Sequence, residues 1–300
     1  DLGRTIVLTG TRRVGKTTIQ YQMIDRLLKK GVPPQKILFV SMDHPMLKLS
    51  GLNDLLECYH SNVYAEQDCY YFFDEIQYAS DWDKWMKTIY DMQPETKMVA
   101  TGSASPALMK GSSESGAGRW SVIQVPTLSF YEYCALIGAR VPELGPEIRP
   151  TAFLHMAQQE RTAVMIKLEE VQNYFMRYLR VGGFPELALA SDDLMAQQIM
   201  REDVVDKVLK RDLPALYKIR SATELERIFL YLCNVSSEIV SFSAIANDLG
   251  GVSRPTVENY VNYLESANLI YQSWPVEMGG HKILKAKPKI YIADAAIRNA

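Results

Sequence analysis

Gly10-Thr11-Arg12-Arg13-Val14-Gly15-Lys16-Thr17-Thr18 is the stretch that decides the fold, because it fits the phosphate-loop pattern G-x-x-x-x-G-K-[ST] without a mismatch. A short apolar run, residues 4–9, precedes this loop, and apolar residues at helical spacing follow it. A loop that joins a strand to a helix in this way can surround a phosphate with backbone N–H groups. Every residue of the stretch is therefore a candidate for nucleotide binding.

The residues of the loop have separate expected roles. Gly10 and Gly15 permit backbone angles and close approaches that a Cβ atom would forbid. Lys16 can reach the β- and γ-phosphates of ATP, and the Thr17 hydroxyl can bind Mg²⁺. Of the remaining pair, Arg12 and Arg13, we expect one to reach phosphate or a neighbouring domain and the other to be solvated.

A second apolar run, residues 70–73, ends in the adjacent acids Asp74 and Glu75. An apolar strand that closes in an acid is the expected Mg²⁺-side partner of a phosphate loop. We expect Asp74 to hold Mg²⁺ through water, and Glu75 to orient and deprotonate the water that attacks the γ-phosphate. The alternative is a solvated acidic turn.

Two further candidate residues lie at the end of a third apolar strand and after it. We expect this strand, residues 97–103, between the acid-bearing strand and the strand before the loop. Its last residue, Ser103, either hydrogen-bonds the attacking water or the γ-phosphate, or simply forms a turn. A glycine- and serine-rich segment, residues 111–118, leads to Arg119. Arg119 either neutralises charge in the transition state or makes a surface salt bridge.

The pattern predicts an α/β fold: a P-loop NTPase with a parallel sheet flanked by helices, followed by an α-helical lid and a winged-helix domain. We expect the nucleotide-binding domain over residues 1–130, the helical lid and linker over 131–215, and the winged-helix domain over 216–300. Residues 289–294 predict a strand just before the sequence stops, so we expect the start of a C-terminal region that is cut short.

Nucleic-acid binding is an open question for the last third of the chain. Residues 242–249 and 253–267 predict a helix-turn-helix with Ser253 as the N-cap of its second helix. That helix carries Glu258 and Glu265, which do not suit a major-groove reader. The wing offers cations that can meet the phosphates of duplex DNA: Lys282, Lys285, Lys287 and Lys289. The other interpretation is packing or docking of an unknown protein partner.

Composition excludes several classes of protein. The chain has 47% hydrophobic and 23% charged residues and a formal net charge of −2, which gives no global attraction to nucleic acid. Its four cysteines form no C-x-x-C pair, and no apolar run is long enough to cross a membrane. We expect a cytoplasmic protein with no membrane association.

The motifs resemble those of uncharacterised bacterial and archaeal AAA+-like ATPases, in which a P-loop domain precedes a winged-helix segment. The similarity covers nearly the whole chain. It implies that Lys16, Thr17, Asp74 and Glu75 bind ATP and Mg²⁺, that Ser103 is the sensor position, and that Arg119 is a finger or sensor arginine. Relatives usually continue into a nuclease-like domain, which this sequence lacks.

We therefore expect an ATPase that hydrolyses ATP with Mg²⁺ and acts as a molecular switch. Two alternatives remain: a nucleotide-gated DNA-binding regulator that hydrolyses poorly, and a P-loop small-molecule kinase. The adjacent acids favour water as the nucleophile over a kinase substrate. A GTPase is disfavoured because the sequence has no N-K-x-D stretch to bind guanine.

Overall fold

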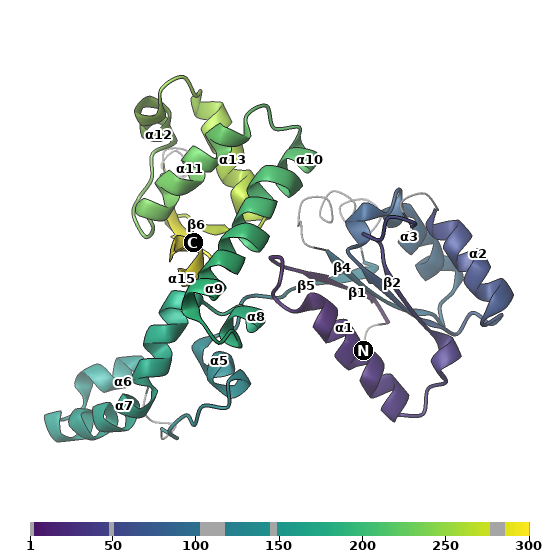
Figure 1. Cartoon of the computed structure of the whole chain (residues 1–300), viewed down its shortest axis with the longest axis horizontal. Helices are drawn as coiled ribbons and strands as arrows, with labels where there is room; N and C mark the ends of the chain where they lie inside the picture. Colours follow the sequence, from purple (N-terminus) through teal and green to yellow (C-terminus); the bar gives the residue numbers. More distant parts are fainter. Residues whose placement is uncertain (1–2, 48–50, 103–117, 145–148, 277–285, 300) are drawn as a thin grey trace.

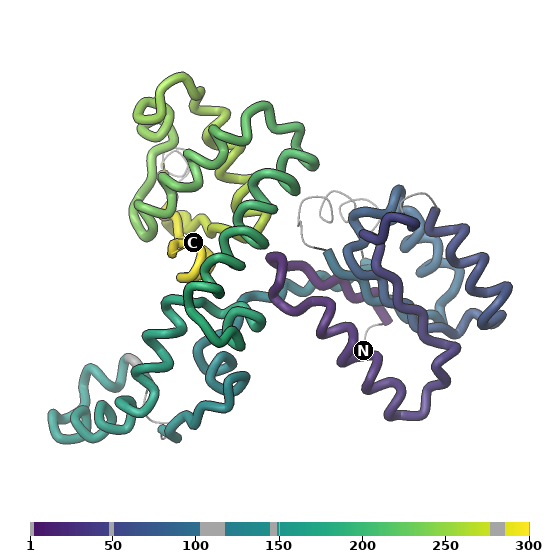
Figure 2. Tube along the Cα trace, in the orientation of Figure 1, coloured from purple at the N-terminus to yellow at the C-terminus, as the bar shows by residue number. Residues whose placement is uncertain are grey.

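The computed structural model describes residues 3–47, 51–102, 118–144, 149–276 and 286–299. Figure 1 shows two lobes, a sheet lobe formed by the purple and blue first part of the chain and a helical lobe formed by the rest. The sheet lobe runs from β1 (Thr5–Thr9) to β5 (Trp120–Gln124), and the helical lobe from α5 (Phe130–Leu136) to α15 (Ala295–Asn299). Figure 2 shows that the loop after β1 reaches towards the helical lobe.

Five parallel strands form the sheet, in the order β2-β3-β4-β1-β5. The strands between β1 and β5 along the chain are β2 (Ile37–Ser41), β3 (Tyr70–Asp74) and β4 (Lys97–Gly102). The predicted parallel sheet is confirmed, and β4 lies between β3 and β1 as expected. Because all strands are parallel, their carboxyl ends meet at one edge of the sheet, where the phosphate loop, Asp74 and Thr101 come together.

Helices flank both faces of the sheet: α1 (Lys16–Lys29), α2 (Leu52–Asn62) and α3 (Trp82–Met92). Alternate strand residues point to opposite faces. Leu8 and Phe72 belong to a cluster with apolar residues of α1, whereas Val7 and Tyr71 belong to a cluster with those of α2 and α3. Burial on both faces explains why these strands are apolar along their whole length.

The helical lobe begins with a series of helices that extends away from the sheet (Figure 1). After α5 they are α6 (Pro150–His155), α7 (Gln158–Val181), α8 (Pro185–Ala188), α9 (Asp193–Ile199), the π-helical stretches η3 (Met200–Asp206) and η4 (Val208–Asp212), and α10 (Leu213–Tyr217). The elements from α9 to α10 follow one another without a loop. This continuous helical stretch faces the phosphate loop.

In the described residues from 222 onwards the chain forms helices and a two-stranded antiparallel sheet: α11 (Ala222–Asn234), α12 (Phe242–Leu249), α13 (Arg254–Ser266), β6 (Ile270–Ser273), β7 (Lys289–Ile292) and then α15. The expected N-cap is confirmed, because the Ser253 side chain accepts a hydrogen bond from the Thr256 N–H at 3.3 Å. One buried cluster joins Phe184 and Val204 to Leu225 and Ile290. The helices from α8 to η4 and the last third therefore share a core, and the lid and the boundary expected near residue 215 stay predictions.

The turn after α7 ties the beginning of the helical lobe to its end. The Gly183 N–H donates to the Asp294 carboxylate at 2.9 Å, and the same carboxylate accepts the Ala296 N–H at 2.9 Å. Gly183 also accepts the Leu128 N–H at 2.7 Å through its carbonyl oxygen. Burial raises the pKa of Asp294, although these hydrogen bonds favour its charged form.

We expect Gly183→Ala to lower the free energy of unfolding by about 3 kcal/mol, because of overpacking. A Cβ atom at this position would lie 2.2 Å from the carbonyl oxygen of Leu128, and that backbone is held in place. Chemical denaturation of the wild-type protein and of the Gly183→Ala variant measures the difference in the free energy of unfolding. Gly51→Ala is the matched control, because its Cβ would meet no atom closer than 3.8 Å. Equal stability of the two variants would contradict the packing described for this turn.

Among the described residues, no helix combines the length and apolar character needed to cross a lipid bilayer.

Candidate functional site

The phosphate loop connects β1 to α1 in a conformation that depends on its two glycines. Gly10 has φ +150°, and a Cβ atom there would lie 2.4 Å from the carbonyl oxygen of Val125. Gly15 has φ +95° and is the N-cap of α1, so the N-cap residue offers no side chain to the N–H groups of the first turn. These N–H groups and the positive end of the helix dipole are therefore available to an anion.

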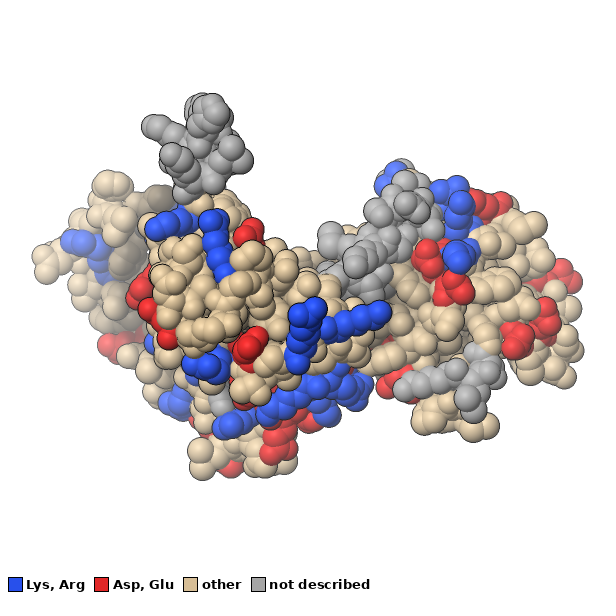
Figure 3. Space-filling view, turned by 90° about the horizontal axis from the view of Figure 1, so that it is seen from above, with Lys and Arg blue, Asp and Glu red and all other residues tan. Residues whose placement is uncertain are grey.

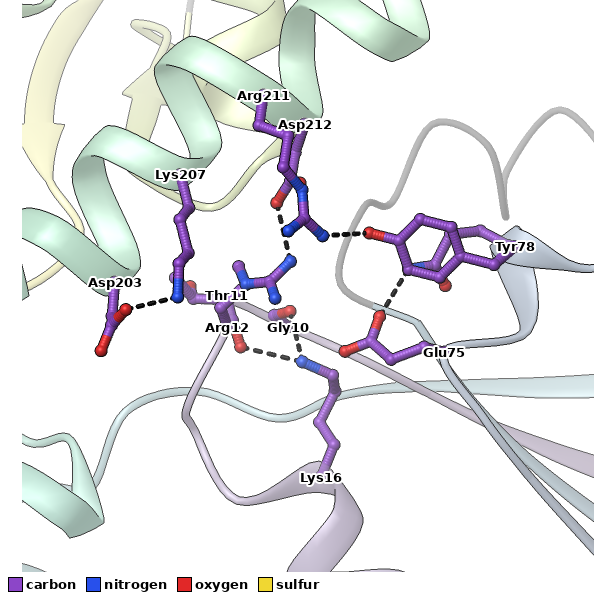
Figure 4. Close-up of polar contacts among 11 residues, drawn as sticks. Gly10, Thr11, Arg12, Lys16, Glu75, Tyr78, Asp203, Lys207, Arg211 and Asp212 are labelled. Atoms are coloured by element: carbon purple, nitrogen blue, oxygen red, sulfur yellow. Dashed lines mark hydrogen bonds and ion pairs between the residues drawn. The ribbon is translucent and has the colours of Figure 1, made fainter. Parts of the chain in front are cut away.

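Lys16 lies under the loop and is 5% exposed. Its Nζ donates to the carbonyl oxygens of Gly10 at 3.0 Å and Thr11 at 2.9 Å (Figure 4). Burial lowers the pKa of Lys16, while the nearby carboxylates of Glu75 and Asp74 oppose that shift. The ammonium group is thus fixed at the centre of the loop.

The Asp74 carboxylate is the meeting point of two hydroxyl groups. Thr17 Oγ1 lies 3.0 Å from both carboxylate oxygens, and Thr101 Oγ1 donates to Oδ1 at 2.6 Å. Burial raises the pKa of Asp74, and the two hydrogen bonds act in the opposite direction. A hydroxyl and a carboxylate placed side by side offer the oxygen ligands that Mg²⁺ prefers, so these residues fit the ion.

Glu75 follows Asp74 in the left-handed region, with φ +51°. Its N–H donates to Thr101 Oγ1 at 3.0 Å, and its carboxylate accepts a hydrogen bond from the Gln77 side chain. Figure 4 shows the Glu75 carboxylate on the side of the sheet edge where Lys16 and Arg12 lie. The left-handed backbone turns Glu75 away from the strand direction, so the two adjacent acids face different partners.

Thr101 is the residue that the sequence interpretation missed. It is fully buried near the end of β4, where it contacts the Asp74 side chain and the Glu75 backbone. Its position two residues before Ser103, in a strand already expected beside β3, was the available signal. Ser103 itself lies outside the described residues.

Both loop arginines reach the helical lobe. Arg12 Nη1 donates to Asp212 Oδ2 at 3.0 Å, and Arg13 pairs with Glu186 and Asp203. The expectation that one arginine is solvated is therefore wrong. The physical reason is that α8 and the π-helical stretches place carboxylates opposite the loop.

Neutral contacts join the loop to the helical lobe as well. Thr11 Oγ1 donates to the Asn268 carbonyl oxygen at 3.2 Å, and Val14 packs in the buried cluster of the helical lobe. Outside the loop, a charged contact also joins the two lobes: Arg211 donates a hydrogen bond at 2.8 Å to the hydroxyl of Tyr78, which lies three residues after Glu75 (Figure 4). The loop is thus clamped between the sheet and the helical lobe.

Arg119 lies at the opposite edge of the sheet. Its carbonyl oxygen accepts the Thr5 N–H at 3.0 Å, which places it beside the beginning of β1. Its guanidinium pairs with Asp91 at 2.7 Å. Since a strand rises about 3.3 Å per residue, the length of β1 separates Arg119 from the loop by about 16 Å. Arg119 therefore does not reach the loop of its own chain, and it makes the surface salt bridge that was the alternative.

An apolar cavity of about 500 Å³ opens beside the loop. Its lining includes Gly15, Thr18, Ile19, Pro126, Ala135 and Pro185. The cavity therefore begins where the loop enters α1 and extends between the two lobes.

A second cavity, of about 420 Å³, lies in the last third of the chain. Arg254, Lys287 and the half-exposed Trp274 line it, together with Glu258. Of the four lysines expected in a wing, Lys287 and Lys289 are exposed, whereas Lys282 and Lys285 lie outside the described residues.

Comparison with known proteins divides the chain into two matched parts. Residues 3–134 match the family model described as an AAA domain. Residues 172–300 match a domain of unknown function. The expected resemblance to AAA-type P-loop ATPases is confirmed.

The similar proteins are themselves uncharacterised. The uncharacterized protein MJ1544 of Methanocaldococcus jannaschii is 26% identical over 88% of this chain and 55% of its own length. An uncharacterized protein of Haemophilus influenzae is 24% identical over 97% of this chain and 68% of its own length. The chain thus spans only part of these curated relatives.

Among solved structures, the Walker-type ATPase PABY2304 of Pyrococcus abyssi has a similar fold. It matches with a TM-score of 0.55 and 14% identity, over 99% of this chain and 90% of its own. At this identity, the likeness concerns the fold alone.

Proposed function

We propose that this AAA-domain chain binds ATP with Mg²⁺ at the carboxyl edge of its sheet and hydrolyses it as a molecular switch. One observation carries the proposal: Lys16, Thr17 and Asp74 converge beneath a glycine loop at a helix N-terminus. Cation, hydroxyl and carboxylate in this arrangement are the groups that a nucleoside triphosphate with Mg²⁺ requires.

The loop residues, from Gly10 to Thr18, bind the phosphates. The uncapped N–H groups of α1 donate to phosphate oxygens, and Lys16 neutralises the β- and γ-phosphates. Thr17 and Asp74 would hold Mg²⁺, Asp74 through water, and the ion would supply positive charge against the negative charge of the phosphates.

Glu75 is the general base of the reaction. It orients a water molecule and accepts its proton as the oxygen attacks the γ-phosphorus. Thr101 acts as a positioning residue, because it holds Asp74 and the Glu75 backbone in place at the same time. Ser103, following the resemblance, would sense the γ-phosphate.

The apolar cavity beside Gly15 and Thr18 accepts the base of the nucleotide. It lies next to the phosphate loop, and its apolar lining suits a flat aromatic ring. Ala135 lies on the exposed side of α5 at the border of this cavity.

We therefore expect Ala135→Trp to raise the KM for ATP by about 10-fold with little change in kcat, because lost base contacts weaken ground-state and transition-state binding alike. Steady-state kinetics measure both constants. Ala215→Trp, on exposed α10 surface away from the cavity lining, is the control. An unchanged KM in the cavity variant would contradict this placement of the base.

The switch follows from the contacts between the loop and the helical lobe. Arg12, Arg13 and Thr11 hold the lobe against the same segment that binds the phosphates. Loss of the γ-phosphate changes the charge beside these contacts and thereby alters how firmly the lobes dock.

The direct test is the release of phosphate from ATP and Mg²⁺ with no acceptor molecule added. We expect turnover that continues beyond one phosphate per chain. Phosphate transfer that requires an added small-molecule acceptor would favour a kinase and contradict the proposed ATPase.

A nucleotide-gated DNA-binding regulator is the second candidate, with the last third of the chain as a winged helix. Figure 3 shows Lys and Arg side chains gathered over the helical lobe in a band that reaches towards the sheet lobe. The exposed cations of this lobe include Lys210, Arg211, Lys218, Arg220, Arg254, Lys287 and Lys289. The cavity between Arg254, Lys287 and Trp274 is the observation that favours this candidate.

If this region binds duplex DNA, Arg254→Ala with Lys287→Ala is expected to weaken binding and to lower the slope of log affinity against log salt by about 2. Fluorescence anisotropy across a salt series measures both quantities. Binding with an unchanged slope would show that these two cations do not contact DNA phosphates.

A further inference from the structure

The structure points to a charge-neutralising arginine within the phosphate loop itself. Figure 4 shows the Arg12 side chain above Lys16, with its guanidinium between Asp212 of the helical lobe and the Glu75 carboxylate of the sheet lobe. Its side chain is 20% exposed, and that of Asp212 is 12% exposed. The pair is therefore largely shielded from solvent, where charges interact more strongly than in water.

The Arg12 guanidinium has more hydrogen-bond donors than its contacts within the protein use. A guanidinium has five N–H donors in a fixed planar arrangement. The contact with Asp212 uses Nη1 at 3.0 Å, and a further hydrogen bond goes to Tyr78. Of the five donors, others can therefore serve a phosphate while both contacts are kept, and the planar guanidinium holds these donors in a fixed geometry that a lysine ammonium does not have.

The electrostatic surroundings agree with this placement. Burial opposes the charge of Arg12, yet Asp212, Glu75 and Tyr78 together raise its pKa. Arg12 in turn contributes to the lowered pKa of Lys16. Two cations so close together in a shielded site repel each other, and an anion bound between them would relieve the repulsion.

We propose that Arg12 is a catalytic residue that stabilises the γ-phosphate in the transition state, and that Asp212 is the positioning residue that aims it. The proposal rests on the proposed ATPase function. During hydrolysis the water oxygen forms a bond to the γ-phosphorus, the bond from that phosphorus to the β–γ bridging oxygen breaks, and Glu75 takes the proton. ADP and phosphate leave. Arg12 donates hydrogen bonds to the oxygens on which negative charge increases.

This arrangement makes the reaction depend on docking of the helical lobe. Asp212 lies at the end of η4, 200 residues from Arg12. Movement of η4 away from the loop would leave Arg12 without its positioning contact and would lower turnover. Arg119, at the other edge of the sheet, does not reach this site within its own chain.

The test compares ground-state and transition-state binding in Arg12→Ala, Arg12→Lys and Asp212→Asn. Calorimetry measures the affinity for ADP with Mg²⁺, alone and with aluminium fluoride as a mimic of the transferred phosphoryl group. For Arg12→Ala we expect kcat to fall about 10³-fold and the affinity for the mimic to fall strongly, with ADP affinity and KM unchanged. Arg12→Lys restores only part of the activity. Asp212→Asn lowers kcat about 10-fold at constant KM.

Asp206→Asn is the matched control, because Asp206 pairs with Lys210 within the same helical stretch, at 3.0 Å, and not with the phosphate loop. We expect its kcat and mimic affinity to equal those of the wild type, and thermal melting confirms that all variants fold. An Arg12→Ala chain with wild-type kcat, or with equal losses for ADP and for the mimic, overturns the inference while the ATPase assignment stands. A higher kcat in Asp212→Asn also overturns it, since the ion pair would then be an inhibitory latch. A wild-type chain that releases no phosphate removes both proposals together.

Discussion

Glu75→Gln is expected to lower kcat for ATP hydrolysis by about 10³-fold and to leave the affinity for ATP with Mg²⁺ unchanged. The amide keeps the size of the side chain and can still face the Gln77 amide, but it cannot accept a proton from water. The binding groups, Lys16, Thr17 and Asp74, are untouched. Steady-state phosphate release gives kcat, and equilibrium titration gives the affinity.

The control for this substitution is Glu95→Gln, an identical change at an exposed glutamate between α3 and β4. It should leave both quantities at wild-type values. A Glu75→Gln chain that hydrolyses ATP at the wild-type rate would show that another group activates the water.

Lys16→Met is expected to weaken ATP binding by at least about 100-fold without lowering thermal stability. The methionine side chain has a similar length, but it lacks the charge that neutralises the phosphates. Because burial lowers the pKa of Lys16, the charged side chain costs free energy in the folded protein without ligand. The melting temperature without nucleotide should therefore not fall.

The same pKa shift fixes the sign of a pH effect. Between the lowered pKa of folded Lys16 and its ordinary value of 10.5, the unfolded chain binds more protons, so Lys16 makes stability rise with pH in that window. Lys16→Met should remove this contribution to the pH dependence of stability.

Lys29→Met, on the exposed side of the same helix, is the control for ATP binding. If Lys29→Met lost as much ATP affinity as Lys16→Met, the assignment of Lys16 as the phosphate-binding cation would be contradicted.

The sequence was sufficient to predict the sheet lobe because its signals are local. The glycine pattern of the loop, the apolar run before Asp74 and the strand at residues 97–103 each determine their own conformation. Parallel pairing then brings their ends together at one edge. The contacts of Thr17 and Thr101 with Asp74 follow from that topology.

Contacts between the lobes could not be predicted in the same way. The partners of Arg12 and Arg13 lie between 173 and 200 residues further along the chain, and nothing near them in the sequence identifies them. The shared core of the helical lobe likewise depends on how separate helices pack. Helical periodicity gives the buried face of each helix but not its neighbour.

Arg119 shows a topological signal that the sequence interpretation did not use. A chain segment that connects two parallel strands leaves one at the carboxyl edge and enters the next at the amino edge. Arg119 directly precedes β5, so it had to lie at the amino edge, away from the phosphate loop. The parallel sheet predicted from the sequence already implied that Arg119 lies at the amino edge.

A single-turnover measurement tests the central claim most directly. The wild-type chain, in excess over radiolabelled ATP, is mixed with Mg²⁺ and sampled over time, in parallel with Glu75→Gln. The account predicts complete conversion of bound ATP to ADP and phosphate by the wild type, and bound but intact ATP on the variant. Intact ATP on the wild-type chain would contradict hydrolysis at this site.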